Sequence, residues 1–109
     1  MAVKVSPRLT AALSLIAALP PDRVVALLRT RLGRLAERRA EIRALIDETV
    51  SGGVHPLFLI EEEYRLALLE AESAFVERFV EQITHPETGW APLWAEFHRP
   101  GTREEEQDA

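Results

Sequence analysis

The stretch Glu61–Ile83, EEEYRLALLEAESAFVERFVEQI, decides the fold because it reads as one long amphipathic helix. Apolar side chains recur in it at steps of three and four residues, which places them on one stripe of a helix: Tyr64, Leu68, Ala71, Phe75 and Phe79. A neighbouring stripe holds Leu69, Val76, Val80 and Ile83. An apolar arc this wide requires a partner on each of two sides. The same chain supplies one partner, and we predict that a second copy supplies the other.

A second long helix is predicted between the proline pair at 20–21 and the stretch Ser51-Gly52-Gly53. Proline suits the first position of a helix and glycine suits its end. Apolar residues recur in this segment with the seven-residue period of a coiled coil. We call this stripe the interhelix seam, and its members are Val25, Leu28, Leu32, Leu35, Arg39, Ile42 and Ile46. Arg39 either extends out of the seam to solvent or forms a buried pair with a glutamate of the third helix.

The short connection between the two long helices predicts that they lie antiparallel as a hairpin. The expected fold class is all-α, with a short N-terminal helix, the hairpin and a short C-terminal helical segment, and with the helical bundle completed by dimerisation. The predicted helices span residues 7–19, 21–50, 57–84 and 91–98.

The predicted domain organisation is simple, since 109 residues allow one domain. Residues 6–98 are expected to form a single helical domain. A flexible leader is expected over residues 1–5, and a disordered acidic tail over residues 99–109.

Composition excludes several classes of protein. The net charge of −5 argues against a nucleic-acid binder that acts through bulk charge. The absence of cysteine excludes disulfide and zinc-ribbon folds. No apolar run approaches the roughly 20 residues of a membrane span, and no signal-peptide pattern is present. We therefore expect a cytoplasmic protein that has no membrane partner.

Residues with catalytic or ligand chemistry are few. The three histidines, His55, His85 and His98, lie in or beside loops without metal-ligand spacing, and no nucleophile or phosphate-loop motif is present. We expect no enzyme, metal or cofactor. The arginine-rich segment 29–43 could contact nucleic acid, but salt bridges to the glutamates of the third helix are the preferred interpretation. Trp90, Trp94 and Phe97 share one face of the last helix and form either plain core or a pocket for a small apolar or aromatic ligand.

Two stretches carry a resemblance to a known family. SPRLTAALSLIAALPPDRVVALLRTRLGRL (residues 6–35) and LFLIEEEYRLALLEAESAFVERFV (residues 57–80) resemble the C-terminal domain of PadR-like transcriptional regulators. The resemblance implies a homodimer interface that includes Leu68, Phe75 and Phe79, and a neighbouring effector pocket. The winged-helix domain with which that family binds DNA has no counterpart in this sequence, so no DNA binding by this chain alone is expected.

Two function classes follow from these observations. The first is a homodimerisation and small-molecule effector-sensing module related to PadR-like regulators. The alternative is a helical adaptor or antagonist that binds a different protein, such as a full-length related regulator, through its wide apolar helix face.

Overall fold

The computed structural model describes residues 9, 13 and 16–97 of the chain. Its elements, in chain order, are the 3₁₀ helix η1 (Ile16–Ala18), α2 (Pro21–Ser51), the 3₁₀ helix η2 (Pro56–Leu59), α3 (Ile60–Thr84) and α4 (Ala91–Glu96). The described residues contain no strand, which confirms the all-α class.

The predicted segments 1–5, 7–19, 91–98 and 99–109 lie partly or wholly outside the described residues. Of the predicted helix 7–19, Leu9 and Leu13 are helical and residues 16–18 form η1. The predicted leader over residues 1–5 and the predicted tail over 99–109 fall entirely outside the described part.

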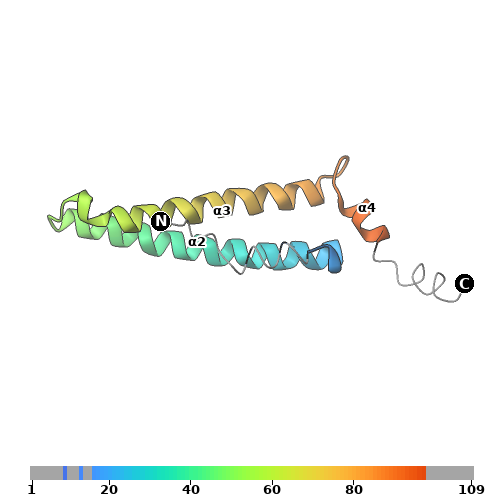
Figure 1. Ribbon diagram of the computed structural model, residues 1–109, viewed down its shortest axis with the longest axis horizontal. Helices are drawn as coiled ribbons and strands as arrows, with labels where there is room; N and C mark the ends of the chain where they lie inside the picture. Colours follow the sequence, from blue (N-terminus) through green and yellow to red (C-terminus); the bar gives the residue numbers. More distant parts are fainter. Residues whose placement is uncertain (1–8, 10–12, 14–15, 98–109) are drawn as a thin grey trace, which may run out of the picture. The chain divides into compact units, whose positions relative to one another are not determined.

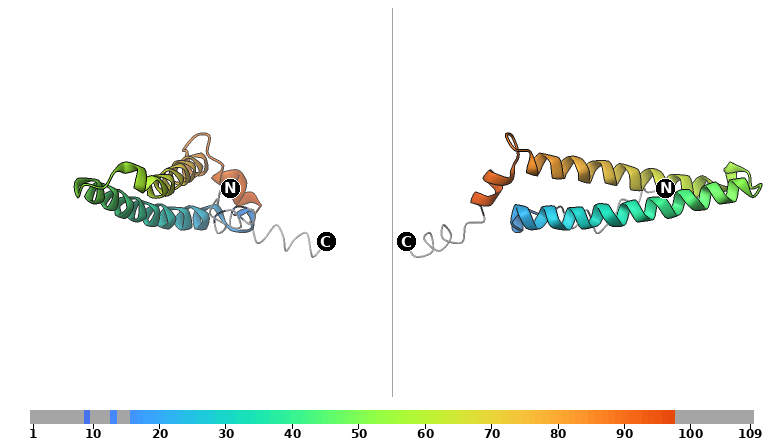
Figure 2. Two further views of the ribbon diagram at one scale, coloured as in Figure 1. Left: turned by 60° about the vertical axis from the view of Figure 1, so that its left-hand side comes forward. Right: turned by 180° about the vertical axis from the view of Figure 1, so that it is seen from behind.

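The chain divides into two compact units. One unit, Leu28–Phe79, contains most of α2 and α3 and the connection between them. The other is formed by Met1–Leu27 and Val80–Ala109. Within Leu28–Phe79 the two long helices run side by side in opposite directions, as the views of Figure 1 and Figure 2 agree, which confirms the predicted hairpin.

Apolar packing holds the Leu28–Phe79 unit together. Its buried cluster contains Ile42 and Ile46 of α2, Leu59 of η2 and Leu66 of α3, with Leu69 packed against them. Burying side chains of this size contributes about 1.5–3 kcal/mol each. Because these residues come from both arms of the hairpin, their burial pairs the two helices.

Helix α2 ends at Ser51, one residue beyond the predicted end, in a Schellman motif. The amide of Val54 donates to the carbonyl of Thr49 (3.2 Å) and that of Gly53 donates to Val50 (3.0 Å). Gly53 has a φ of +100°, a conformation that side chains with a Cβ rarely adopt. The glycine at this position therefore lets the chain reverse direction.

The start of the third helix differs from the prediction. Residues Pro56–Leu59 form a 3₁₀ turn rather than the first turn of an α-helix, and α3 begins at Ile60. The His55 Nδ1 atom accepts the amide of Leu57 (3.0 Å), and the His55 carbonyl accepts the amide of Phe58 (3.0 Å). The i→i+3 hydrogen bond sets a tighter turn than an α-helix has. Glu61, Glu62 and Glu63 occupy the first turn of α3, where the helix dipole favours negative charge.

In the second unit, a tight turn joins α3 to α4. Gly89 leaves no room for a side chain, since a Cβ there would lie 2.4 Å from the His85 carbonyl oxygen. The Trp94 indole Nε1 donates to the carbonyl of Leu19 (2.8 Å), which ties α4 to the residues that precede α2. Helix α4 ends at Glu96, short of the predicted residue 98, and Phe97 caps it.

We predict that Gly53→Ala lowers the free energy of unfolding by about 1–2 kcal/mol, because alanine is strained at positive φ. Gly52→Ala is the control, since its Cβ would make only ordinary contacts of 3.4 and 3.5 Å. Urea unfolding followed by circular dichroism, at one protein concentration, measures both. Equal losses of stability in the two variants would contradict the role of the Gly53 conformation.

Candidate functional site

The outer face of α3 carries a partly exposed apolar stripe. Tyr64 is 40% exposed, Phe75 is 41% exposed and Ala71 is exposed, whereas Leu68 and Phe79 are half-buried. We call Tyr64, Leu68, Ala71, Phe75 and Phe79 the α3 stripe. Leu66 and Val76, on another side of the same helix, are buried. The helix is therefore apolar on two sides, of which one is covered.

Phe75 lies at the middle of a small cluster on the α3 stripe. Its ring centroid is 6.3 Å from that of Phe79, and the two rings are tilted by 45°. The guanidinium carbon of Arg78 lies 5.8 Å from the Phe75 ring centroid. Both geometries are favourable for aromatic and cation–π attraction. These contacts support the ring of Phe75 at the surface.

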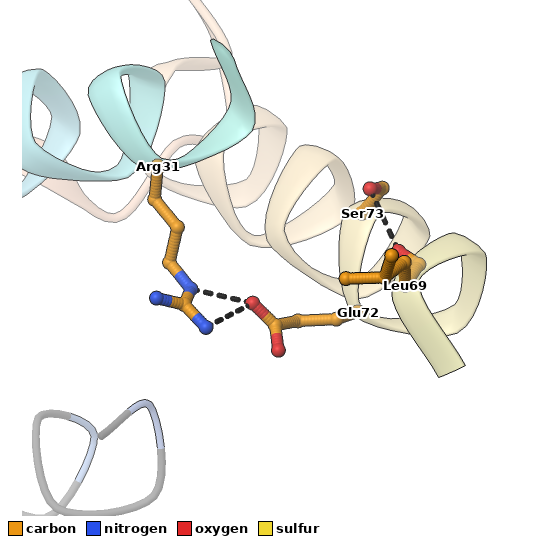
Figure 3. A network of polar contacts seen from close by, with 4 residues as sticks. All are labelled: Arg31, Leu69, Glu72 and Ser73. Atoms are coloured by element: carbon orange, nitrogen blue, oxygen red, sulfur yellow. Dashed lines mark hydrogen bonds and ion pairs between the residues drawn. The ribbon is translucent and has the colours of Figure 1, made fainter. Parts of the chain in front are cut away.

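The edge of the stripe meets α2 through an ion pair. Figure 3 shows Arg31 of α2 reaching Glu72 of α3, where one carboxylate oxygen accepts from both Nε and Nη2 at 2.5 Å. The Glu72 side chain is 13% exposed and that of Arg31 is 29% exposed. A second interhelix pair, Arg43–Glu70 (2.8 Å), is more exposed. Screening by solvent limits the stabilisation from an exposed ion pair to about 0–1 kcal/mol. Because the Arg31–Glu72 pair is less exposed than Arg43–Glu70, it is the stronger determinant of the register of the two helices.

Ser73 is a buried polar residue beside this pair. Its hydroxyl donates to the carbonyl of Leu69 (2.8 Å), one turn back on the same helix (Figure 3). A hydrogen bond of this kind satisfies the buried hydroxyl. The hydrogen bond of Ser73 therefore lies within helix α3.

The structure places the residues of the interhelix seam at or near the interior. Val25, Leu28, Leu35, Ile42 and Ile46 are buried, and Leu32 and Arg39 are half-buried. Arg39 forms no ion pair with any residue that the structure describes, so the alternative of a buried pair with a glutamate of the third helix is not realised among them. Its Nε atom is buried without a hydrogen-bond partner.

A second exposed apolar surface, which sequence reasoning missed, lies at the closed end of the hairpin. Phe58 is 75% exposed, Ile60 is 67% exposed and Leu57 is 65% exposed. We call these three residues the tip patch. Residues 47–63 around it contain five carboxylates and no lysine or arginine. Periodicity assigned Leu57 and Phe58 to the start of a helix and did not indicate that these side chains are exposed.

The three aromatic residues near the C-terminal helix differ in their exposure among the described residues. Phe97 and Trp90 are exposed, and α4 contains no buried residue. Trp94 is half-buried and its indole is used as a donor to Leu19. The two alternatives for Trp90, Trp94 and Phe97, plain core and a ligand pocket, both stay predictions.

The described histidines act as turn caps. His55 Nδ1 accepts the Leu57 amide, and His85 Nδ1 accepts the amides of Glu87 and Thr88 (both 3.2 Å). The position of His55 directly before Pro56 is a sequence signal that could have identified its capping role. Among the residues that the structure describes, no three histidine or carboxylate side chains gather in a way that could hold a metal ion.

Comparison with known proteins finds no relative of this chain. No protein-family model, curated protein or solved structure matches the chain. In the part of the chain that the structure describes, no helix has both the length and the apolar character needed to cross a membrane.

We predict that Arg39→Met raises the free energy of unfolding by about 1 kcal/mol, because methionine keeps the apolar stem and removes the unpaired donor. Arg38→Met on the exposed side of the same helix is the control and should change stability by less than about 0.5 kcal/mol. Thermal and urea unfolding compare the two variants. A loss of stability in Arg39→Met would show that the guanidinium contributes favourably.

Proposed function

We propose that this chain is a homodimerisation module whose self-interface is the α3 stripe. The observation that carries the proposal is the division of α3 into two apolar sides. Leu66 packs against Ile42 and Ile46 of α2, whereas Phe75 and Tyr64 face outward and stay about two-fifths exposed. A second copy offers the same apolar stripe in return, which is the condition for a symmetric interface.

The charges of the hairpin support a protein partner over nucleic acid. Arg31 and Arg43, two arginines of the basic segment, are paired with Glu72 and Glu70 of the neighbouring helix. The chain as a whole carries a net charge of −5. Phosphate binding depends on unpaired basic side chains gathered on one surface. The interhelix pairing and the acidic balance both oppose such binding.

Relation to PadR-like regulators is part of the same proposal and is supported by the resemblance of residues 6–35 and 57–80. A module of this kind dimerises without catalysing a reaction. An effector-sensing role is the less supported component, because Trp90 and Phe97 stand exposed at the surface. Dimerisation is accordingly the function that the geometry favours.

We predict that Phe75→Glu splits the dimer, raising its Kd by about 100-fold or more, because a central aromatic anchor is replaced by a charge. Light scattering over a concentration series measures the solution mass. Ala40→Glu, at an exposed position of α2, is the matched control and should leave the mass unchanged. A native chain that is monomeric at high micromolar concentration would contradict the proposal.

A second candidate function, an adaptor that binds a different protein, is favoured by the tip patch. Phe58, Ile60 and Leu57 are the most exposed large apolar group on the hairpin. Residues 47–63 around them carry five carboxylates, of which Glu61 alone is paired, with Arg65 (2.6 Å). Tip-to-tip contact between two copies would bring like charges together. An apolar segment flanked by lysine or arginine would instead be complementary to this surface.

We predict that an amphipathic helical peptide with a lysine-rich polar face binds the hairpin, and that its glutamate-rich counterpart of equal apolar content does not. Phe58→Ser should weaken the binding of the lysine-rich peptide by about 10-fold, equivalent to about 1.4 kcal/mol. Phe75→Ser should leave the binding of this peptide unchanged. Fluorescence anisotropy with labelled peptides provides the affinities. Equal binding of both peptides, or loss of binding in Phe75→Ser alone, would contradict a role for the tip patch.

A further inference from the structure

We propose that the two copies associate through α3 in antiparallel orientation, with the two-fold axis passing beside Ala71. The inference rests on the proposed homodimerisation through the α3 stripe and adds to it the direction and register of the two helices. Three features of the Leu28–Phe79 unit carry it: the spacing of the stripe, two charges that lack ion-pair partners, and the neutralised charge at the centre.

The spacing of the α3 stripe is symmetric about a point between Ala71 and Glu72. Leu68 and Phe75 lie at equal distances on either side of that point, and so do Tyr64 and Phe79. At a rise of about 1.5 Å per residue the two pairs lie roughly 5 and 11 Å from it along the helix. An antiparallel second copy therefore sets Leu68 against Phe75 and Tyr64 against Phe79.

The residue at the centre of the stripe suits this arrangement. Ala71 is small and exposed, so two α3 helices can approach closely where they cross. Of the three rings on the stripe, those of Phe75 and Phe79 lie to one side of Ala71 in each copy and that of Tyr64 lies to the other. In antiparallel orientation each bulky ring meets the opposite half of its neighbour, and neither half is overcrowded.

Charge complementarity selects the antiparallel direction. Glu63 and Arg78 lie on the same flank of the stripe, and neither forms an ion pair with a residue that the structure describes. In the antiparallel register Arg78 of one copy lies about 3 Å along the axis from the level of Glu63 of the other, within reach of its long side chain, and the contact occurs twice. In a parallel dimer this flank lies on opposite sides of the interface in the two copies, so Arg78 and Glu63 would not meet.

The Arg31–Glu72 pair removes the main electrostatic obstacle to this register. Glu72 lies next to the proposed axis, so the two copies bring their Glu72 side chains toward each other. Arg31 already holds that carboxylate within each single chain (Figure 3). The pair thus neutralises the centre of the interface before association.

Single cysteines report the direction directly, because the chain has no cysteine of its own. A disulfide requires Cα atoms closer than about 7 Å. We expect a mixture of Leu68→Cys and Phe75→Cys chains to form at least about tenfold more cross-linked dimer than either variant alone. Ala71→Cys should cross-link with itself, and Ala40→Cys on α2 should not.

Each outcome of this experiment is decisive. Light scattering first establishes which variants remain dimeric, and Tyr64→Cys with Phe79→Cys replaces any pair that does not. Self-cross-linking of Leu68→Cys and of Phe75→Cys, without enrichment in the mixture, would establish a parallel dimer and overturn the inference while the proposed function stands. A dimer that cross-links at none of the stripe positions would also overturn it. A native chain that is monomeric would contradict the proposed function itself.

Discussion

Apolar burial between the two arms of the hairpin is the constraint on which the Leu28–Phe79 unit depends. The stability of a helix in a protein comes mostly from tertiary packing of its apolar face, because nucleation is unfavourable and intrinsic propensities contribute little. Ile42 and Ile46 of α2 are covered only where Leu59 and Leu66 of the other arm meet them. The turn conformation of Gly53 matters for the same reason, since it returns the chain to the position where this burial takes place.

Polar groups in the hairpin select its register more than they stabilise it. The Arg31–Glu72 pair joins the two helices at one level and Arg43–Glu70 at another. Arg39 is different, because it occupies an interior position of the seam and leaves its Nε atom without a partner. Buried polar groups that lack partners are unfavourable for stability.

The surface of this hairpin is divided between two apolar regions of different chemistry. The α3 stripe is moderately exposed and has an arginine beside its central ring, whereas the tip patch is strongly exposed and has an excess of carboxylates around it. The two surfaces therefore suit different partners. The stripe is compatible with a copy of itself, and the tip patch favours a basic segment of another protein. Both can be occupied at once if the dimer leaves the tip free.

The sequence by itself determined the helical class, the hairpin and which residues of α2 turn inward, because the period of apolar residues, the prolines and the glycines act locally. It also placed Phe75 and Tyr64 on a stripe separate from Val76. Only the tertiary structure decided which stripe of α3 is covered by α2, that Arg31 pairs with Glu72, and that Arg39 pairs with no described residue. It also decided that residues 56–59 form a 3₁₀ turn that exposes Leu57 and Phe58. These outcomes depend on distances between residues far apart in the chain and on the geometry of a single turn, neither of which periodicity specifies.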